Sequence, residues 1–315
     1  MDKLVLGGVN RDNVIDFLVE DFYVVHPEIS IKDGKLIKNF DLYLNFDGTI
    51  TNNNFLDLLK YYSVPVIGHN RLPKWKQLEF ARSLGVNVPK TYKQVHPIDK
   101  EHLTYSIFKF LEEYYENDEF VLKSENGARG IGQMIVKKNQ IYDLYQNITR
   151  GNINNEYLSN NFKLGESKNF HDDSEMGFLR NSILDLDFSI MKKLSLKKEW
   201  RYIYVYGNDP IIVERKVSDA GNWQANVSVT GKGNQVIFND ADEEHLYMRE
   251  KANLIAEKLN VPFLSIDFYM DNQDRIGIFE FQMQMGFKKV DKTDLTKNIV
   301  KGFKEFINDK IKNKF

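Results

Sequence analysis

Short apolar runs alternate with longer, more polar stretches between Lys3 and Ile67. The runs are Leu4–Leu6, Phe22–Val25, Leu42–Phe46 and Val64–Ile67. Runs this short, spaced widely enough for a helix or a long turn between them, are typical of strands in a mostly parallel α/β sheet. Between the first two runs, Asn13–Glu20 carries its apolar residues on one helical face. The pattern therefore predicts an N-terminal α/β domain.

A further helix is predicted from Pro73 to Gly85. Proline favours the first turn of a helix, and glycine ends helices because it readily adopts a positive φ. Apolar residues recur between Pro73 and Gly85 at helical spacing, and Val86–Thr91 is predicted to form an extended segment after the helix. The first domain boundary is placed here, so that residues 1–88 form the N-terminal domain.

Two more domains are predicted on residues 89–194 and 195–315. Residues 147–181 are rich in Asn, Ser, Gly, Asp and Glu and have few β-branched residues, which indicates a long, mobile surface insertion. Near the C-terminus, apolar residues recur at helical spacing with lysines off the stripe. The apolar positions are Leu295, Ile299, Phe303, Phe306, Ile307 and Ile311. This pattern predicts a C-terminal helix docked on the core.

Composition excludes several classes of protein. The 315 residues include 43 Lys and Arg against 45 Asp and Glu, a net charge of −2, so the chain lacks the excess positive charge of a nucleic-acid coat. There is no cysteine, which removes disulfides, thiolate nucleophiles and Cys-ligated metals. No apolar stretch of about 20 residues or signal-peptide core is present. We predict a cytoplasmic protein that binds neither membranes nor nucleic acid.

A glycine-rich loop between two apolar strands is the first candidate site. Phe120–Leu122 runs into Lys123, a loop with three glycines follows, and a second apolar strand begins at Met134. Glycines let backbone N–H groups approach an anion, and Lys123 adds a positive charge. Because the loop leads from strand to strand, it is neither a P-loop nor a dinucleotide loop. The alternative is an ordinary β-hairpin with a glycine-rich turn.

An acidic β-hairpin is the second candidate site. Phe263–Met270 and Ile276–Gln282 are strand-like runs, and a loop at Asn272–Arg275 places Asp267 opposite Glu280. Cross-strand Cβ atoms lie ~4.5–5.5 Å apart, where two carboxylates repel each other unless a cation lies between them. Gln282 shares the strand face of Glu280, and such an all-oxygen set suits Mg²⁺. The alternative is that one of these side chains points to solvent.

These two hairpins in this order resemble the ATP-grasp superfamily and, within it, the RimK-like carboxylate–amine ligases. The resemblance runs from about Val64 to Val290. It implies an α/β (α+β ATP-grasp) fold in which an N-terminal α/β domain is followed by two ATP-grasp subdomains that sandwich ATP. Mg²⁺ or Mn²⁺ would accompany the nucleotide.

The resemblance also assigns nucleotide-binding residues. Lys74 and Lys123 would contact the ATP phosphates, and the loop containing Gly127, Gly130 and Gly132 would close over them. The adenine-binding backbone corresponds to Lys192, Lys193 and Leu194, and Glu199 would accept from the ribose hydroxyls. Taken without these motifs, Glu199 and Arg201 would be read as a surface ion pair.

The remaining matches lie around the transferred phosphoryl group and the metal. Arg201 would face phosphate or a substrate carboxylate, and Arg215, Gln224 and Asn226 would surround the phosphoryl group. Gln224 stands where the family has arginine. Asp267, Glu280 and Gln282 correspond to the metal ligands, and Gln282 replaces the family's asparagine with a side chain one methylene longer.

The implied reaction joins a small-molecule or peptide carboxylate to an amine through an acyl phosphate, with release of ADP. Two alternatives stay open: a kinase that phosphorylates a small molecule, and a nucleotide-binding regulator without turnover. A homodimer would be ordinary for the family. The sequence contains no motif that identifies the substrate pair.

Overall fold

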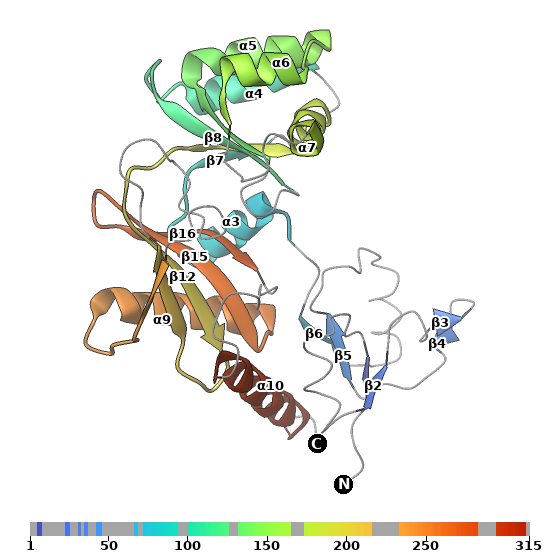
Figure 1. Ribbon diagram of the computed structural model, residues 1–315, viewed down its shortest axis with the longest axis vertical. Helices are drawn as coiled ribbons and strands as arrows, with labels where there is room; N and C mark the ends of the chain where they lie inside the picture. The colour runs from blue at the N-terminus through green and yellow to red at the C-terminus, as the bar shows by residue number, and fades with distance from the viewer. Residues whose placement is uncertain are drawn as a thin grey trace.

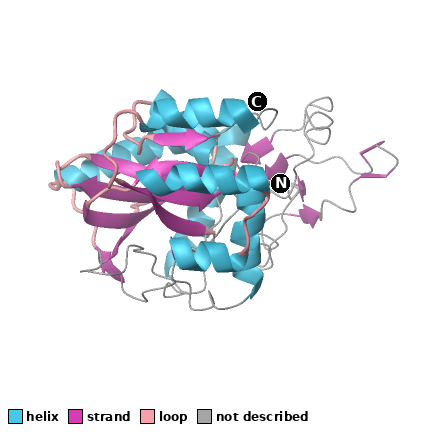
Figure 2. Cartoon of the chain, turned by 90° about the horizontal axis from the view of Figure 1, so that it is seen from above, coloured by secondary structure: helices cyan, strands magenta, loops and turns pink. Residues whose placement is uncertain are grey.

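The computed structural model describes residues 5–7, 23–25, 31–32, 35–36, 42–45, 66–68, 72–93, 100–125, 132–164, 173–215, 233–282 and 294–312. In these ranges the strands form three sheets of four or five strands and one short ribbon, β3 (Ile31–Lys32) with β4 (Lys35–Leu36). The N-terminal strands lie to one side of the rest of the chain (Figures 1 and 2). The predicted domain boundaries at residues 88 and 194 stay a prediction.

The N-terminal sheet is parallel, with strand order β2-β1-β5-β6. Its strands are β1 (Val5–Gly7), β2 (Tyr23–Val25), β5 (Leu42–Asn45) and β6 (Val66–Gly68). All four overlap the predicted apolar runs, which confirms the expected parallel sheet. The helix predicted at Asn13–Glu20 lies outside the described residues.

The middle sheet is antiparallel, with strand order β10-β9-β8-β11-β7. Its strands are β7 (Thr91–Lys93), β8 (Glu119–Ser124), β9 (Gln133–Lys137), β10 (Lys163–Leu164) and β11 (Phe188–Lys192). The helices α4 (Lys100–Leu111), α5 (Lys138–Arg150), α6 (Asn155–Asn161) and α7 (Asp173–Leu184) share one apolar core with this sheet. The direct β8–β9 pairing confirms that the glycine loop joins two strands.

The prediction of a mobile insertion at residues 147–181 is wrong for the residues that the structure describes there. The segment contains α6 and parts of α5 and α7, and it buries Ile148, Ile153, Leu158 and Phe162 in the core of the middle sheet. Asn154 accepts a hydrogen bond from the backbone N–H of Tyr157 as the N-cap of α6, at 2.8 Å. The polar composition thus reflects helix caps and exposed faces around a few well-placed apolar residues.

The C-terminal sheet is also antiparallel, with strand order β14-β13-β12-β15-β16. Its strands are β12 (Leu196–Val205), β13 (Ile211–Arg215), β14 (Gly233–Val236), β15 (Phe263–Asp271) and β16 (Ile276–Gln282). Helix α9 (Glu243–Leu259) packs on one face, where Trp200, Tyr202, Ile266 and Phe268 form the core. Residues that alternate with these therefore occupy the opposite face.

The predicted C-terminal helix is confirmed as α10 (Asp294–Lys312). It buries Phe303, Phe306 and Ile307, as its apolar stripe indicated. Among the described residues, no helix is both long and apolar enough to cross a membrane.

Helix α3 (Lys74–Ser83) lies between the middle and C-terminal sheets and contacts both of them (Figure 1). Pro73 is its N-cap, and Gly85 follows its end at φ +73°, as the sequence predicts. The side chain of Gln77 accepts the backbone N–H of Phe281 at 3.0 Å. Beyond the helix, the backbone carbonyl of Asn87 accepts the N–H of Ile278 at 3.0 Å. This segment therefore extends the edge of β16.

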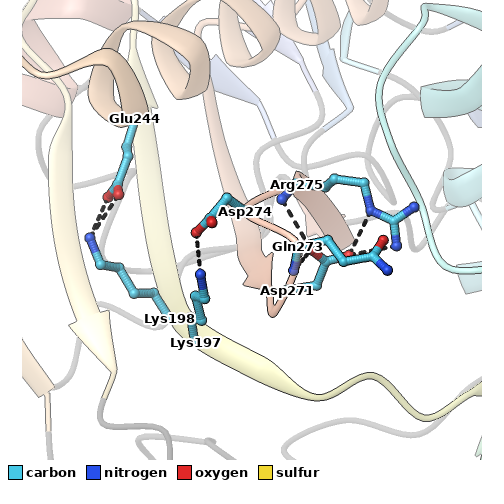
Figure 3. Close-up of polar contacts among 7 residues, drawn as sticks. All are labelled: Lys197, Lys198, Glu244, Asp271, Gln273, Asp274 and Arg275. Atoms are coloured by element: carbon cyan, nitrogen blue, oxygen red, sulfur yellow. Dashed lines mark hydrogen bonds and ion pairs between the residues drawn. The ribbon is translucent and has the colours of Figure 1, made fainter.

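The β15–β16 hairpin closes with the predicted loop, residues 272–275. The carboxylate of Asp271 stabilises the turn by accepting hydrogen bonds from the backbone N–H groups of Gln273 and Arg275, at 2.9 and 3.0 Å. It also pairs with the Arg275 guanidinium (Figure 3). Asp274 holds a positive φ of 58° and pairs with Lys197. These contacts satisfy the polar groups of the turn.

A β-bulge at Phe279 sets the register of the same hairpin. Met270 pairs with Ile276 and Phe268 with Ile278, whereas Asp267 pairs with Glu280. Ile278 and Phe281 both reach the core under the sheet, so the extra residue places Phe279 and Glu280 together on the other face. Without the bulge, Phe279 would oppose Asp267.

We predict that Gly277→Ala weakens the junction between β16 and the segment after α3. A Cβ at position 277 would lie 2.7 Å from the backbone carbonyl of Asn87 and 2.5 Å from the Tyr269 hydroxyl. Overpacking of this kind costs about 1–3 kcal/mol, which urea unfolding measures. Gly177→Ala in α7, where a Cβ meets nothing within 4 Å, is the matched control. An equal loss of stability in both variants would contradict the assignment.

Candidate functional site

Charged side chains converge on the face of the C-terminal sheet that is opposite α9. Across neighbouring strands, Glu199 lies opposite Arg215, Arg201 opposite Asp267, and Asp267 opposite Glu280. Gln282 lies two residues from Glu280 and opposite Ser265. The predicted pairing of Asp267 with Glu280 is therefore confirmed.

Two arginines hold the carboxylates of this cluster. Arg201 donates to Asp267 in a bidentate pair, Nε to Oδ1 and Nη2 to Oδ2, both at 2.8 Å. Arg215 donates from Nη2 to Asp267 Oδ1 at 2.9 Å and from Nη1 to Glu199 Oε1 at 2.5 Å. Glu199, Arg215 and Asp267 are buried. The alternative reading of Glu199 and Arg201 as a surface ion pair with each other is wrong.

The buried charges shift one another's titration. Burial raises the pKa of Asp267, but the charges of Arg201 and then Arg215 outweigh it and lower this pKa to about 2. Burial raises the pKa of Glu199 above its ordinary value, although Arg215 opposes the shift. The pKa of Arg201 is raised, chiefly by the charge of Asp267 and also by Glu280. Asp267 is therefore fully ionised at neutral pH.

The donor set on this face fits Mg²⁺ in its chemistry. Glu280 and Gln282 are half-buried oxygen donors beside Asp267, and Mg²⁺ takes one or two carboxylates together with phosphate and water. The described residues contain no group of three or more His, Cys, Asp or Glu side chains with metal-binding geometry. A metal here would thus depend on two carboxylates, an amide and a ligand's own oxygens.

Two lysines, one on the middle sheet and one on α3, lie on the opposite side of the candidate site. Lys123 on β8 places its ammonium 5.1 Å from the centre of the Phe279 ring on β16. Lys74, the first residue of α3, donates from Nζ to the backbone carbonyl of Ser124 at 3.0 Å. The structure therefore brings both predicted phosphate lysines to the end of β8, where the glycine loop begins.

Glu125 anchors the start of α3 to the same loop. Its Oε2 accepts the backbone N–H of Trp75 at 3.1 Å, and its own N–H donates to the carbonyl of Asp187 after α7. The side chain is 3% exposed, and its Oε1 has no hydrogen-bond partner within the described residues. Glu125 was not predicted from the sequence, although an acidic residue at the start of a glycine loop is a usable signal.

An apolar cluster lies between the two sheets beside Lys123. Leu78 of α3, Val121 of β8 and Met191 of β11 are buried, and Val88 and Phe279 pack against them. The ring of Phe279 also packs on Tyr269, with centroids 4.5 Å apart. These residues were not predicted from the sequence, because periodicity marks an apolar position as core without showing which elements meet there.

The side chains of Lys192 and Lys193 are engaged within the middle sheet. Lys192 pairs with Asp118 at 2.5 Å and lies over the rings of Tyr114 and Phe120, and Lys193 pairs with Glu119. Leu194 follows at the end of β11. Any contact of these two lysines with a nucleotide base would therefore come from the backbone.

The structure describes Gly132 but not all of the glycine loop. Gly132 has φ +73°, and a Cβ there would lie 2.8 Å from Ser124 Cβ and 3.0 Å from the ring of Phe178, so only glycine fits. Four other predicted site residues lie outside the described part of the chain: Gly127, Gly130, Gln224 and Asn226.

We predict that Glu125→Ala loosens the first turn of α3. Loss of a side chain that accepts from a helix's first N–H groups costs about 0.5–2 kcal/mol, and amide hydrogen exchange at Trp75 should rise. Glu125→Gln keeps an acceptor oxygen and should retain most of the protection. Unchanged exchange in Glu125→Ala would show that Glu125 does not hold the helix.

Comparison with known proteins reveals likeness in structure only: no protein-family model and no curated sequence matches the chain. D-cycloserine synthetase DcsG superposes with a TM-score of 0.58 at 11% identity, over 96% of this chain and 99% of the other. D-alanyl-alanine synthetase A from Vibrio cholerae gives 0.54 at 11% identity, over 98% of both chains.

The ATP-grasp ligase PsnB, solved with a precursor variant, Mg and ADP, gives a TM-score of 0.51 at 12% identity, over 98% of this chain and 99% of the other. Identities this low establish the fold and not the reaction. With an N-terminal parallel sheet followed by two antiparallel sheets that face each other across the candidate site, the chain has the ATP-grasp fold, as the sequence predicts.

Proposed function

We propose that this chain is an ATP- and Mg²⁺-dependent ligase that joins a carboxylate to an amine. One observation carries the proposal: lysines from α3 and β8 and a cluster of buried and half-buried charges on β12, β13, β15 and β16 face the same region between two sheets. The fold supports it, because the structural neighbours are named as ligases and synthetases.

Cationic side chains would bind the triphosphate. Lys123 and Lys74 lie at the root of the glycine loop, where backbone N–H groups add further donors. Arg215 is fixed by Glu199 and Asp267, and its Nε has no partner within the described residues. In this proposal Arg215 stabilises charge on the transferred phosphoryl group, together with Gln224 and Asn226.

The base and ribose would occupy the apolar cluster. Val121, Met191 and Phe279 offer flat and aliphatic surfaces from both sheets, and the backbone of Lys192–Leu194 lies at the end of β11. Glu199 would accept from the ribose hydroxyls, as the family resemblance implies. Bound nucleotide would thus displace side chains that now pack on one another.

Glu280, Gln282 and Asp267 would hold Mg²⁺. When bound, the metal would supply charge neutralisation for the phosphate oxygens. The neighbour PsnB was solved with Mg and ADP, which supports a metal requirement in this fold.

The proposed reaction has two steps. A substrate carboxylate oxygen attacks the γ-phosphorus of ATP, the bond to the β,γ-bridging oxygen breaks, and an acyl phosphate and ADP form. The amine then attacks the acyl carbon, phosphate leaves and the amine loses a proton, which yields an amide. The chain's own residues would position the reactants and neutralise charge. Membership of the RimK-like group, cytoplasmic location and a homodimer are part of this proposal.

ADP release in the presence of hydroxylamine tests the reaction class. With candidate amino acids, peptides or small carboxylates, we expect ADP release together with a hydroxamate, because hydroxylamine traps acyl phosphates. A phosphate ester without hydroxamate would instead identify a kinase. Nucleotide-stabilised melting with no ADP release under any condition would identify a regulator.

We predict that Glu280→Ala abolishes ATP turnover, with a fall of at least about 10³-fold, because removal of one charged partner of a phosphoryl-transfer site costs rates of that order. Glu214→Ala is the control, since Glu214 is exposed and its neighbour in the strand, Arg215, faces the site. ADP release measures both variants. Full turnover in Glu280→Ala would remove Glu280 from the metal site.

A further inference from the structure

Asp267 and Glu280 lie directly opposite each other on β15 and β16. Two ionised carboxylates at neighbouring cross-strand positions repel unless a cation offsets them. In the structure the guanidinium of Arg201 supplies that cation. It makes a bidentate pair with Asp267, and Asp267 lies opposite Arg201 on one side and Glu280 on the other. A side chain thus occupies the electrostatic role that the sequence analysis gave to a metal.

The arginines leave Asp267 little capacity for another ligand. A carboxylate has about four lone-pair positions, and three donors already use the oxygens of Asp267: Arg201 Nε, Arg201 Nη2 and Arg215 Nη2. A metal that binds Asp267 must compete with at least one of these donors. It must also approach against the positive charge of the guanidinium.

The two arginines differ in how easily each could move away from Asp267. The side chain of Arg215 is 4% exposed and is held by both Glu199 and Asp267. The side chain of Arg201 is 33% exposed, and Asp267 is its hydrogen-bond partner within the described residues. Arg201 can therefore move toward solvent or toward a ligand, whereas Arg215 would have to break two buried pairs.

We propose that Arg201 is a built-in competitor for the metal position, so that the divalent cation binds Asp267 only when a phosphate draws the guanidinium away. This inference rests on the proposed function, because it concerns the metal of the same site. Phosphate suits the exchange, since guanidinium binds phosphate in the same bidentate manner as carboxylate. Metal and nucleotide then bind cooperatively, and each tightens the other by the same factor.

Binding of Mn²⁺ alone tests the competition without any turnover. Free Mn²⁺ is measured by electron paramagnetic resonance during titration of the wild-type protein, Arg201→Gln and Arg275→Gln. We expect Arg201→Gln to bind Mn²⁺ at least tenfold more tightly than wild type. Tenfold corresponds to about 1.4 kcal/mol. Addition of ADP should tighten Mn²⁺ binding more in wild type than in Arg201→Gln.

Arg275 is the matched control. It makes a guanidinium–carboxylate pair with Asp271, in which Nε and Nη2 both contact Oδ2 (Figure 3). This pair lies at the turn of the β15–β16 hairpin, four residues along β15 from Asp267. Its side chain is 62% exposed. Arg201 lies on β12 and Arg275 in the turn of the hairpin, but each guanidinium pairs with an aspartate of β15. Arg275→Gln therefore removes the same charge from a partner of the same strand and should leave Mn²⁺ affinity within twofold of wild type.

Equal Mn²⁺ affinity in wild type and Arg201→Gln would overturn the inference, as would an equal gain in Arg275→Gln. Circular dichroism establishes whether each variant folds. If Arg201→Gln does not fold, Arg201→Lys takes its place, because lysine keeps the charge and loses the bidentate geometry. Tighter Mn²⁺ binding by Arg201→Lys than by wild type then supports the inference, and unchanged binding overturns it. Absence of ATP turnover in wild type would reject the proposed function and leave the Mn²⁺ comparison intact.

Discussion

A network of two carboxylates and two guanidinium groups, of which only Arg201 is partly exposed, governs the C-terminal sheet. Removal of an ion from water costs several kcal/mol, so that buried charges persist only in well-formed pairs. Glu199, Arg215, Asp267 and Arg201 meet this condition across three strands, β13, β12 and β15. A one-residue slip of any of these strands would turn its charged side chains toward α9. The network therefore specifies both the register of the strands and the face that carries the site.

The position of α3 depends on that register. Gln77 and Asn87 hold the helix and its exit to β16, while Lys74 and Trp75 hold its start to the end of β8. A ten-residue helix is thus bonded to both sheets. A change in the spacing of the sheets would therefore strain the bonds at both ends of this segment, including those of the N-terminal turn where Lys74 lies. The helix thus carries Lys74 and links the end of β8, where Lys123 lies, to the C-terminal sheet with its charged cluster.

The sequence predicted the parallel N-terminal strands, the glycine hairpin and the opposition of Asp267 and Glu280, because each follows from local periodicity. The opposition of Asp267 and Glu280 was predicted from a continuous ladder that begins with Asp271 opposite Ile276. In the structure Met270 lies opposite Ile276, one residue out of that register, and the bulge at Phe279 restores the predicted opposition. The arginine partners of Asp267 could not be predicted, since a pairing of β13, β12 and β15 is a property of topology. Composition misled at residues 147–181, where caps and exposed faces outnumber core residues.

The network has a chemical meaning beyond register. Apolar side chains of similar volume would stabilise the sheet as well or better, because the attraction within a buried ion pair barely offsets desolvation. Its value lies in charges that are oriented before a ligand arrives. Arg215 is locked by two carboxylates, whereas Arg201 is a third exposed and bound to one. A fixed cation such as Arg215 stabilises charge that develops at one point. A movable cation such as Arg201 can shift its pairing from a carboxylate to a phosphate. The two arginines are therefore suited to different parts of one reaction.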